Sequence, residues 1–387
     1  MNVVENLKWK KTPVLNDGFI CLVDVMGNDD RIVQAARTSY GKDKRESTDE
    51  SIRAELFSEH FKENLIDYHA TAPGSSVCLK YYADGTVQEY IETEAERNVW
   101  RDLPNYFVKQ QKKDRGLIRR LMNDGHTSPF EKVKFEFLIR VPMDCWRQWI
   151  RHRTADVNEY STRYSEAIDS QQVTLPGEWR LQSKDNKQGS SGFLEQWPED
   201  CQVKVWYDDE LRYWVVNGLL DNTEAAGSQF YIDGDKDKQC TPGQLLSHLE
   251  TQLIEYAQEI YRIRLQLGVA REQARKDLPL STYTEAYWGC SLHNIFNFLR
   301  LRLDKHAQLE IRLYAQAMYD IIKQVCPIAC EAFEDYVLQA VKFSRMEMKI
   351  IHSMYQQFLA DDNAITKNPD HGMTDNEWKT FLEKISC

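Results

Sequence analysis

The sequence KVKFEFLIRVPMDCWRQWIRHR, residues 132–153, decides the expected fold. Apolar and polar side chains alternate along its first half, which predicts a half-buried strand at residues 132–141. Pro142 suits the first turn of a following helix. The apolar positions of that helix are Trp146, Trp149 and Ile150. We expect the helix to fray near residues 154–158 and to pass into an irregular segment.

The end of this predicted helix is cationic. Arg147 and Arg151 are four residues apart and are therefore neighbours on a helix surface. Arg151, His152 and Arg153 follow one another, so their side chains point about 100° apart and can face two anionic ligands. A solvated cationic helix end is the simpler interpretation of these three residues alone.

Outward from this unit, helices outnumber strands. A buried strand is predicted at residues 19–26, and the next helix follows it, with Ser39 just beyond its end. A hairpin is predicted around residues 84–85, and residues 170–245, which contain four tryptophans, read as a folded insertion. Helices are predicted at residues 115–124, 241–267, 269–276, 292–303 and 306–325. The expected fold class is α+β, helix-dominant, with a small mixed or antiparallel sheet.

Composition limits the classes of function. The chain has 387 residues, of which 42% are hydrophobic, and its net charge is −11. This excludes a disordered chain and argues against a general nucleic-acid coat or a basic membrane binder. No apolar run approaches the roughly 18 residues of a membrane span, and the N-terminus lacks the core of a signal peptide. Nine cysteines in such a chain indicate reduced thiols and a cytoplasmic protein.

Arginines gather in two segments of this acidic chain. Residues 140–163 contain five arginines and three acids, and residues 261–302 contain six arginines, one lysine and three acids. Because the planar guanidinium fits phosphate and carboxylate groups bidentately, the two segments predict a local anion site. Either segment alone is equally typical of an ordinary helix surface.

Several common signatures are absent from the sequence. It has no GxGxxG, no P-loop, no GxSxG and no cysteine and histidine spacing that completes a zinc site. No metal site is therefore predicted. Cys145 and Cys290 are conceivable nucleophiles, although buried, inert thiols are the more frequent case.

Arg151, His152 and Arg153, seven further residues and then Ser161 match a specific motif. This RHRx7S pattern, within RHRTADVNEYSTRYS, resembles the signature of the flavin-dependent thymidylate synthases. Four more blocks are similar to that family: GFICLVDVMGNDDRIVQAARTSYGK at 18–42, HTSPFE at 126–131, AREQARKDLP at 270–279 and NFLRLRLDKHAQLEIRLYA at 297–315.

The resemblance implies methylation of dUMP to dTMP, with methylenetetrahydrofolate as carbon donor, FAD as mediator and NADPH as reductant. It implies a catalytic domain at residues 1–345, with insertions at about 46–112 and 175–240, and a C-terminal extension at 346–387. It also implies a homotetramer whose subunits share active sites. All these ligands are anionic, which accounts for the gathered arginines.

The resemblance also implies roles for individual residues. Those expected around FAD are Ser39, His126, Ser128, Arg151, His152, Arg153, Glu159, Ser291, His293 and Asn297. Those expected to hold dUMP are Gln148, Arg151, Glu159, Ser161, Arg163, Arg275 and Arg302. Arg302 is the expected catalytic residue and lies against the uracil ring in the family.

Two other readings remain open from the sequence. One is a catalytically silent homologue that keeps a flavin or nucleotide and acts as an interaction protein. The other is a small nucleotide- or RNA-binding module in which the arginines contact phosphates only.

Overall fold

A computed structural model describes residues 3–39, 65–70, 77–82, 87–91, 112–184, 189–199, 201, 203–218, 229–360, 377, 378 and 381. The chain divides into two compact units. The first unit consists of Met1–Asn28 and Phe130–Cys326, and the second of Asp29–Pro129 and Pro327–Cys387. Among the residues described, no helix combines the length and the apolar composition that crossing a membrane requires.

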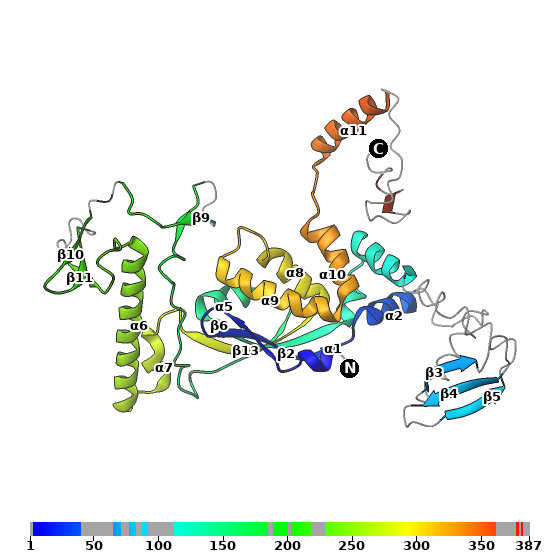
Figure 1. Ribbon diagram of the computed structural model, residues 1–387, viewed down its shortest axis with the longest axis horizontal. Helices are drawn as coiled ribbons and strands as arrows, with labels where there is room; N and C mark the ends of the chain where they lie inside the picture. The colour runs from blue at the N-terminus through cyan, green and yellow to red at the C-terminus, as the bar shows by residue number, and fades with distance from the viewer. Residues whose placement is uncertain are drawn as a thin grey trace. The chain divides into compact units, whose positions relative to one another are not determined.

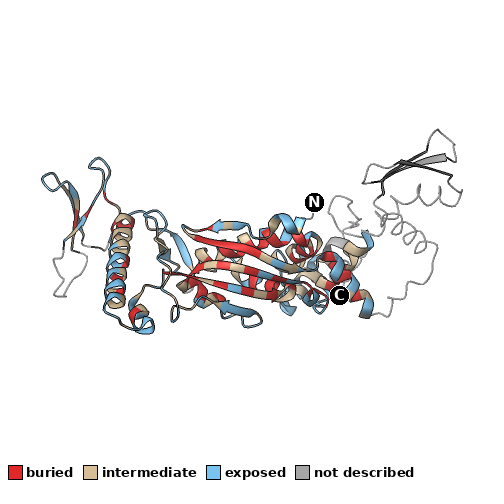
Figure 2. Cartoon of the chain, turned by 90° about the horizontal axis from the view of Figure 1, so that it is seen from below, coloured by how far each residue is buried: buried red, intermediate tan, exposed pale blue. Residues whose placement is uncertain are grey.

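The first unit is built on an antiparallel sheet with strand order β1-β2-β6-β13-β7 (Figure 1). The strands are β1 (Lys11–Val14), β2 (Gly18–Met26), β6 (Lys134–Pro142), β13 (Tyr283–Ser291) and β7 (Asp156–Glu159). The alternation predicted for β6 is confirmed, because Phe135, Phe137 and Ile139 are buried whereas Lys134 and Glu136 are exposed. Buried residues run along these strands in Figure 2.

Three helices pack on this sheet: α5 (Met143–Trp149), α8 (Leu292–Arg302) and α9 (Leu309–Val325). Trp149 is fully buried where they meet, with its ring 4.7 Å from that of Phe298 and 5.8 Å from that of Trp288. Truncating a buried aromatic side chain of this kind costs about 3–5 kcal/mol. The arginine-bearing end of α5 is thus fixed to the core by its own tryptophans.

The predicted end of α5 is wrong. The helix stops at Trp149, Pro142 is its N-cap rather than part of its first turn, and Ile150 is 43% exposed. Residues 151–155 form a turn, and the chain then enters β7, which pairs with β13. Neither strand was predicted, because their pairing joins segments about 130 residues apart and leaves little local pattern. The side chains of Arg151, His152 and Arg153 therefore project from a turn and not from a helix.

The helix predicted at residues 241–267 is confirmed as α6 (Pro242–Gln266), with Thr241 and Gln244 forming a capping box. Several apolar side chains at helical spacing are nevertheless exposed: Leu253 is 62% and Tyr256 65% exposed. The buried positions in the middle of the helix are Ile254, Ala257 and Tyr261. The sequence pattern correctly predicted a helix, but it did not show which of its apolar side chains are buried against the rest of the chain.

The insertion before α6 is folded, as predicted. Its strands are β8 (Arg180–Gln182), β9 (Ser190–Phe193), β10 (Lys204–Asp208), β11 (Tyr213–Asn217) and β12 (Phe230–Ile232). The β10-β11-β12 sheet packs on the start of α6 through buried Val216, Ile232 and Leu245. After α6 come α7 (Arg271–Ala274) and the 3-10 turn η2 (Arg275–Asp277). Two short helices complete the unit: α1 (Val3–Leu7) and η1 (Phe130–Lys132).

The second unit contains the β3-β4-β5 sheet and several helices. The strands are β3 (Leu65–Ala70), β4 (Val77–Tyr82) and β5 (Val87–Ile91), and β4 and β5 form the predicted hairpin. The helices are α2 (Asp29–Ser39), residues 112–123, α10 (Pro327–Phe333), η3 (Glu334–Leu338) and α11 (Arg345–Ala360). Asp29 accepts hydrogen bonds from the N–H groups of Ile328 and Ala329, which ties α2 to the start of α10.

Candidate functional site

Arg302, the last residue of α8, reaches back to the segment at the end of α5. Its Nε donates a hydrogen bond to His152 Nε2 at 3.2 Å, and its Nη2 donates to the carbonyl oxygen of Gln148 at 3.4 Å. Burial, together with the nearby guanidinium, lowers the pKa of His152 to about 4. The imidazole is therefore neutral at physiological pH. Two segments 150 residues apart in sequence meet at this contact.

A relay of side-chain amides lies beside this contact. Gln148 Nε2 donates to Gln308 Oε1, and Gln308 Nε2 donates to Asp144 Oδ2 at 2.9 Å. Because a carboxylate only accepts hydrogen bonds, Asp144 fixes the direction of both amides. Sequence reasoning placed Gln308 near Arg302 but gave it no role, since an uncharged amide on a helix start carries no distinctive signal.

A second cluster joins the loop after β7 to the region of α7 and η2. Arg275 donates to the Thr162 hydroxyl, and Arg163 forms an exposed ion pair with Glu272 at 3.6 Å. The loop turns at Ser161, whose hydroxyl accepts from the Arg163 N–H at 3.4 Å. Arg163 and Arg275 were predicted from separate motifs to hold one ligand, and the structure places their segments side by side.

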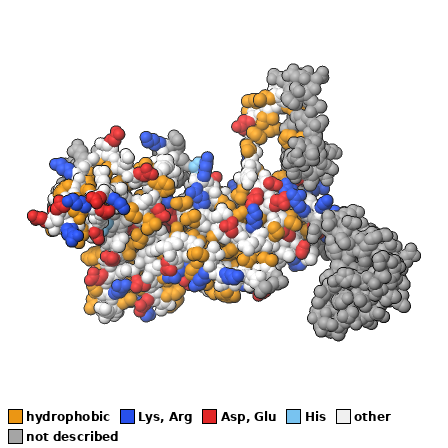
Figure 3. All heavy atoms as spheres, in the orientation of Figure 1, with side chains coloured by type: hydrophobic (Ala, Val, Ile, Leu, Met, Phe, Trp, Pro, Cys, Tyr) orange, Lys and Arg blue, Asp and Glu red, His pale blue; other side chains and the backbone are white. Residues whose placement is uncertain are grey.

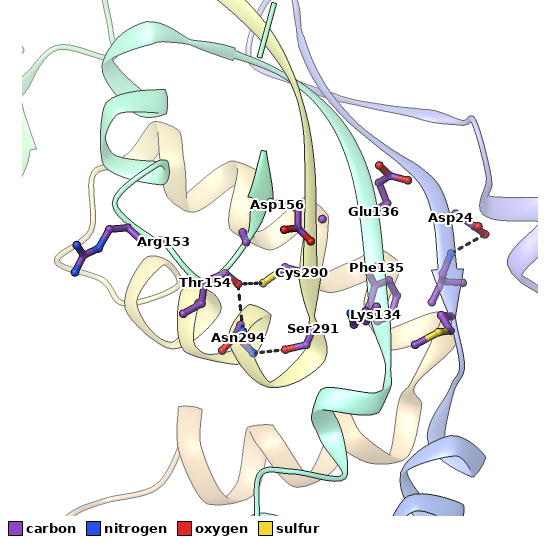
Figure 4. A pocket seen from close by; sticks show the side chains of 14 residues that line it. Asp24, Lys134, Phe135, Glu136, Arg153, Thr154, Asp156, Cys290, Ser291 and Asn294 are labelled. Carbon is purple, nitrogen blue, oxygen red and sulfur yellow. Dashed lines mark hydrogen bonds between the residues drawn. The ribbon is translucent and has the colours of Figure 1, made fainter. Parts of the chain in front are cut away.

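A cavity of about 560 Å³ opens where β13 ends and α8 begins. It is lined by the ends of β2, β6 and β13, by residues 153–156 and by the start of α8 (Figure 4). Two predicted cofactor residues, Arg153 and Ser291, belong to its lining. Asn294 Nδ2 and Cys290 Sγ both donate to the carbonyl oxygen of Thr154, at 3.2 Å each, which holds the 153–156 segment against α8.

The polarity of this cavity fits a nucleotide. Its lining includes the carboxylates of Asp24, Glu136 and Asp156, groups that accept hydrogen bonds from sugar hydroxyls. Arg153 and Lys134 of the same lining are cationic donors for phosphate oxygens. In Figure 4 the Arg153 side chain points away from the three carboxylates, whereas Lys134, the other cation of the lining, lies on the same strand as Glu136.

The remaining residues predicted to bind FAD or dUMP lie outside these clusters and this cavity. Ser39 ends α2 instead of following it. His126 and Ser128 lie in the turn after the helix at 112–123, in the second unit, so their relation to the arginines stays a prediction. The other predicted residues lie in the first unit. Arg151 is exposed, and His293 is half-buried on α8. Glu159 accepts a hydrogen bond from Thr284 Oγ1 at 3.0 Å, and Asn297 accepts one from Arg300 at 3.1 Å.

The two cysteines considered as nucleophiles are poorly suited to that role. Cys145 is fully buried, and burial raises the pKa of its thiol far above the usual range. Burial raises the pKa of Cys290 to about 12, and its Sγ is engaged with the Thr154 carbonyl. Because the thiolate is the reactive form, neither side chain is an activated nucleophile at neutral pH.

The fold and site define an α+β protein that gathers guanidinium groups, a neutral imidazole and amides from distant segments. The family described as thymidylate synthase complementing protein matches residues 21–328, and the chain belongs to this family. The flavin-dependent thymidylate synthase of Treponema denticola is 33% identical over 97% of both chains. An enzyme of that name from Thermus thermophilus is 34% identical over 88% of this chain and 85% of its own.

A solved structure was also found. A UMP/dUMP methylase from Streptomyces cacaoi, bound with 5-Br dUMP, aligns with a TM-score of 0.48 and 24% sequence identity. The alignment covers 84% of this chain and 99% of that one. The family predicted from the RHRx7S motif is confirmed by the family match and the two synthases.

Proposed function

We propose that the protein is a cytoplasmic enzyme that methylates dUMP to dTMP, with methylenetetrahydrofolate as carbon donor, FAD as cofactor and NADPH as reductant. The observation that carries this proposal is the meeting of Arg302 with the segment bearing Gln148 and His152. Membership of the thymidylate synthase complementing family supports it. The proposed catalytic domain and extension are residues 1–345 and 346–387.

The nucleotide would be held by its phosphate and its base. Arg163, Arg275 and Ser161 offer a cationic and hydroxyl surface for the phosphate, and Gln148 offers a directed amide. Arg302 would face the pyrimidine, where a guanidinium stabilises the negative charge on the carbonyl oxygens and N3 that makes C5 nucleophilic. One charge pair at ~4 Å is worth about 4 kcal/mol at an effective dielectric near 20, or roughly a thousandfold in rate.

Arg153 and Ser291 would hold part of FAD in the cavity, with the carboxylates there accepting hydrogen bonds from its hydroxyl groups. When bound, FAD supplies the two-electron redox chemistry that the amino acids of the chain lack. The other candidate FAD ligands in the first unit are Arg151, His152, Glu159, His293 and Asn297. The candidate FAD ligands in the second unit are Ser39, His126 and Ser128.

The test is tritium release from C5-labelled dUMP in the presence of methylenetetrahydrofolate and NADPH. We expect a yellow protein with a flavin absorption band that releases tritium. Bound flavin without release would indicate the silent homologue. Absence of flavin after reconstitution would favour a simple nucleotide-binding module.

Replacing Cys145 or Cys290 by alanine should leave most of the activity, since neither thiol is ionised at neutral pH. We expect kcat within about threefold of wild type, an effect of less than 1 kcal/mol on the barrier. Tritium release measures this, with circular dichroism to verify folding. Complete loss of activity in a folded variant would require a thiol-based mechanism.

We also propose the homotetramer that the family resemblance implies, and an apolar stripe along α6 supports it. The stripe consists of the exposed Leu253, Tyr256 and Ile263, the half-buried Ile260 and, at the C-cap, the exposed Leu267, which recur at alternating three- and four-residue steps. This is the spacing by which helices pair along a seam. Hydrophobic side chains gather along the edge where α6 lies in Figure 3. A second copy of the chain is the partner we propose for this stripe.

The double substitution Tyr256→Lys and Ile263→Lys should therefore produce smaller species, because it places two charges in the seam. Size-exclusion chromatography with light scattering checks this. Glu255→Lys, an exposed change on the same helix beside the stripe, is the matched control. A double variant that remains tetrameric would exclude α6 from the interface.

A further inference from the structure

The amide relay formed by Asp144, Gln308 and Gln148 runs in one direction only. Asp144 lies on α5, four residues before Gln148, and Gln308 is the N-cap of α9. Because a carboxylate only accepts hydrogen bonds, Gln308 must turn its Nε2 toward Asp144, at 2.9 Å, and its Oε1 toward Gln148. Gln148 must then present its own Nε2 to Gln308. Since the two ends of a glutamine amide have nearly the same shape, only this chain of contacts selects one orientation.

Gln148 is held both by its backbone and by its side chain. Its backbone carbonyl accepts a hydrogen bond from Arg302 Nη2 at 3.4 Å, and its side-chain Nε2 donates to Gln308. Among the residues that the structure describes, none donates a hydrogen bond to the Oε1 of Gln148. This oxygen and the second N–H of Nε2 are therefore the groups that Gln148 can offer to a ligand.

The insertion stabilises the helix start that carries Gln308. Nη2 of Arg180, on β8, donates to both carboxylate oxygens of Glu310, at 2.7 and 2.9 Å. Glu310 lies in the first turn of α9, two residues after Gln308. The two side chains are only 21% and 18% exposed, so this charge-assisted contact is screened less than a surface ion pair. The insertion thus reaches the residue next to the relay.

We propose that Gln308 is a positioning residue for dUMP binding, which holds the amide of Gln148 in the orientation that Asp144 dictates. Arg180 of the insertion keeps the start of α9 in place for this contact. The inference rests on the proposed function in one respect, namely that Gln148 contacts dUMP. It also gives a task to the insertion at about 175–240, to which neither a motif nor the family resemblance assigns a residue.

Substitutions that keep the size of the side chains but change their hydrogen bonds test the relay. Gln308→Met fills the same space and makes neither contact. Asp144→Asn lets the amide of residue 308 turn either way. Gln308→Glu loses the donor to Asp144 and places two carboxylates side by side. The double variant Asp144→Asn with Gln308→Glu exchanges the two groups, so an amide donates to a carboxylate that can still only accept from Gln148.

We expect the Kd of flavin-loaded protein for dUMP to rise about 5–30-fold in Gln308→Met and Gln308→Glu and about 3–10-fold in Asp144→Asn. In the double variant it should return to within about threefold of wild type. At saturating dUMP, kcat should stay within about fivefold of wild type in all four proteins. Flavin content should not change, because neither residue lines the cavity proposed for FAD.

Gln316→Ala is the matched control, since this glutamine of α9 is exposed and donates to Asp320 instead. Wild-type affinity for dUMP in Gln308→Met would overturn the positioning role. A double variant that binds dUMP no better than Gln308→Glu would overturn the directed relay and leave Gln308 with packing alone.

Arg180→Ala tests the contribution of the insertion. We expect the Kd for dUMP to rise about 3–10-fold, with a smaller rise in Arg180→Lys, which keeps a cation near Glu310. Lys305→Ala is the control, because it removes an exposed cation three residues from both Arg302 and Gln308. Unchanged affinity in Arg180→Ala would overturn the role proposed for the insertion.

Isothermal titration calorimetry with dUMP keeps this proposal apart from the proposed function, because it requires neither folate nor NADPH. A wild-type protein that binds dUMP but releases no tritium, with the variants in the expected order of affinity, would refute the reaction and retain the relay. A wild-type protein that releases tritium, while every relay variant binds dUMP equally well, would refute the relay and retain the reaction.

Discussion

Replacing Arg302 by alanine should abolish turnover, with kcat reduced about a thousandfold, while flavin stays bound. The size of the effect follows from one lost charge interaction of about 4 kcal/mol at ~4 Å and an effective dielectric near 20. Flavin should remain because the cavity lined by Arg153 and Ser291 does not include Arg302. Tritium release and the flavin absorption band measure the two quantities on the same sample.

Arg302→Lys sharpens this experiment. It keeps a cation but lacks the planar fork whose Nε and Nη2 contact His152 and Gln148 together. We expect activity between those of wild type and the alanine variant. Lys305→Ala should behave as wild type. If the alanine variant lost its flavin, Arg302 would belong to the cofactor site, and if it kept full activity the proposed catalytic role would be wrong.

The sequence predicts those elements whose pattern is local. The strand at 132–141 alternates, α6 begins with a capping box at Thr241, and the helix before Gly125 ends there, with the His126 N–H bonded to the Leu121 carbonyl. β7 and β13 were missed because each depends on a partner far away in the chain. The exposed apolar residues of α6 show the opposite limit: periodicity identifies an apolar face but does not say whether the chain buries it.

For the candidate site, too, residues with a local sequence signal were predicted, and residues that depend on distant contacts were not. Charged and motif-bearing residues such as Arg163, Arg275 and Arg302 were predicted from the resemblance, and their clustering in arginine-rich segments was visible without it. Gln308 was missed because its role depends on a contact with Asp144, 164 residues away. The carboxylates of the cavity come from separate strands and share no sequence spacing, so only the folded sheet brings them together.

Gly18→Ala should strongly destabilise the first unit, because no space exists for a methyl group at the start of β2. A Cβ built there would overlap the Tyr314 hydroxyl and lie 2.6 Å from the Val14 carbonyl oxygen and 2.9 Å from that of Arg140. None of these atoms can retreat easily. The carbonyls belong to the ends of β1 and β6, and the fully buried Tyr314 donates to the Arg140 carbonyl at 2.7 Å.

We expect a loss of about 3–5 kcal/mol in the free energy of unfolding, at or beyond the upper range for overpacked sites, out of a total of roughly 5–15 kcal/mol. Denaturant unfolding and soluble yield measure this. Gly177→Ala is the matched control, since nothing lies within 4 Å of a Cβ at that position. Combining Gly18→Ala with Tyr314→Phe should recover only part of the loss, because the two backbone carbonyls remain. A Gly18→Ala protein as stable as the control would mean that β1, β2 and α9 do not pack as described.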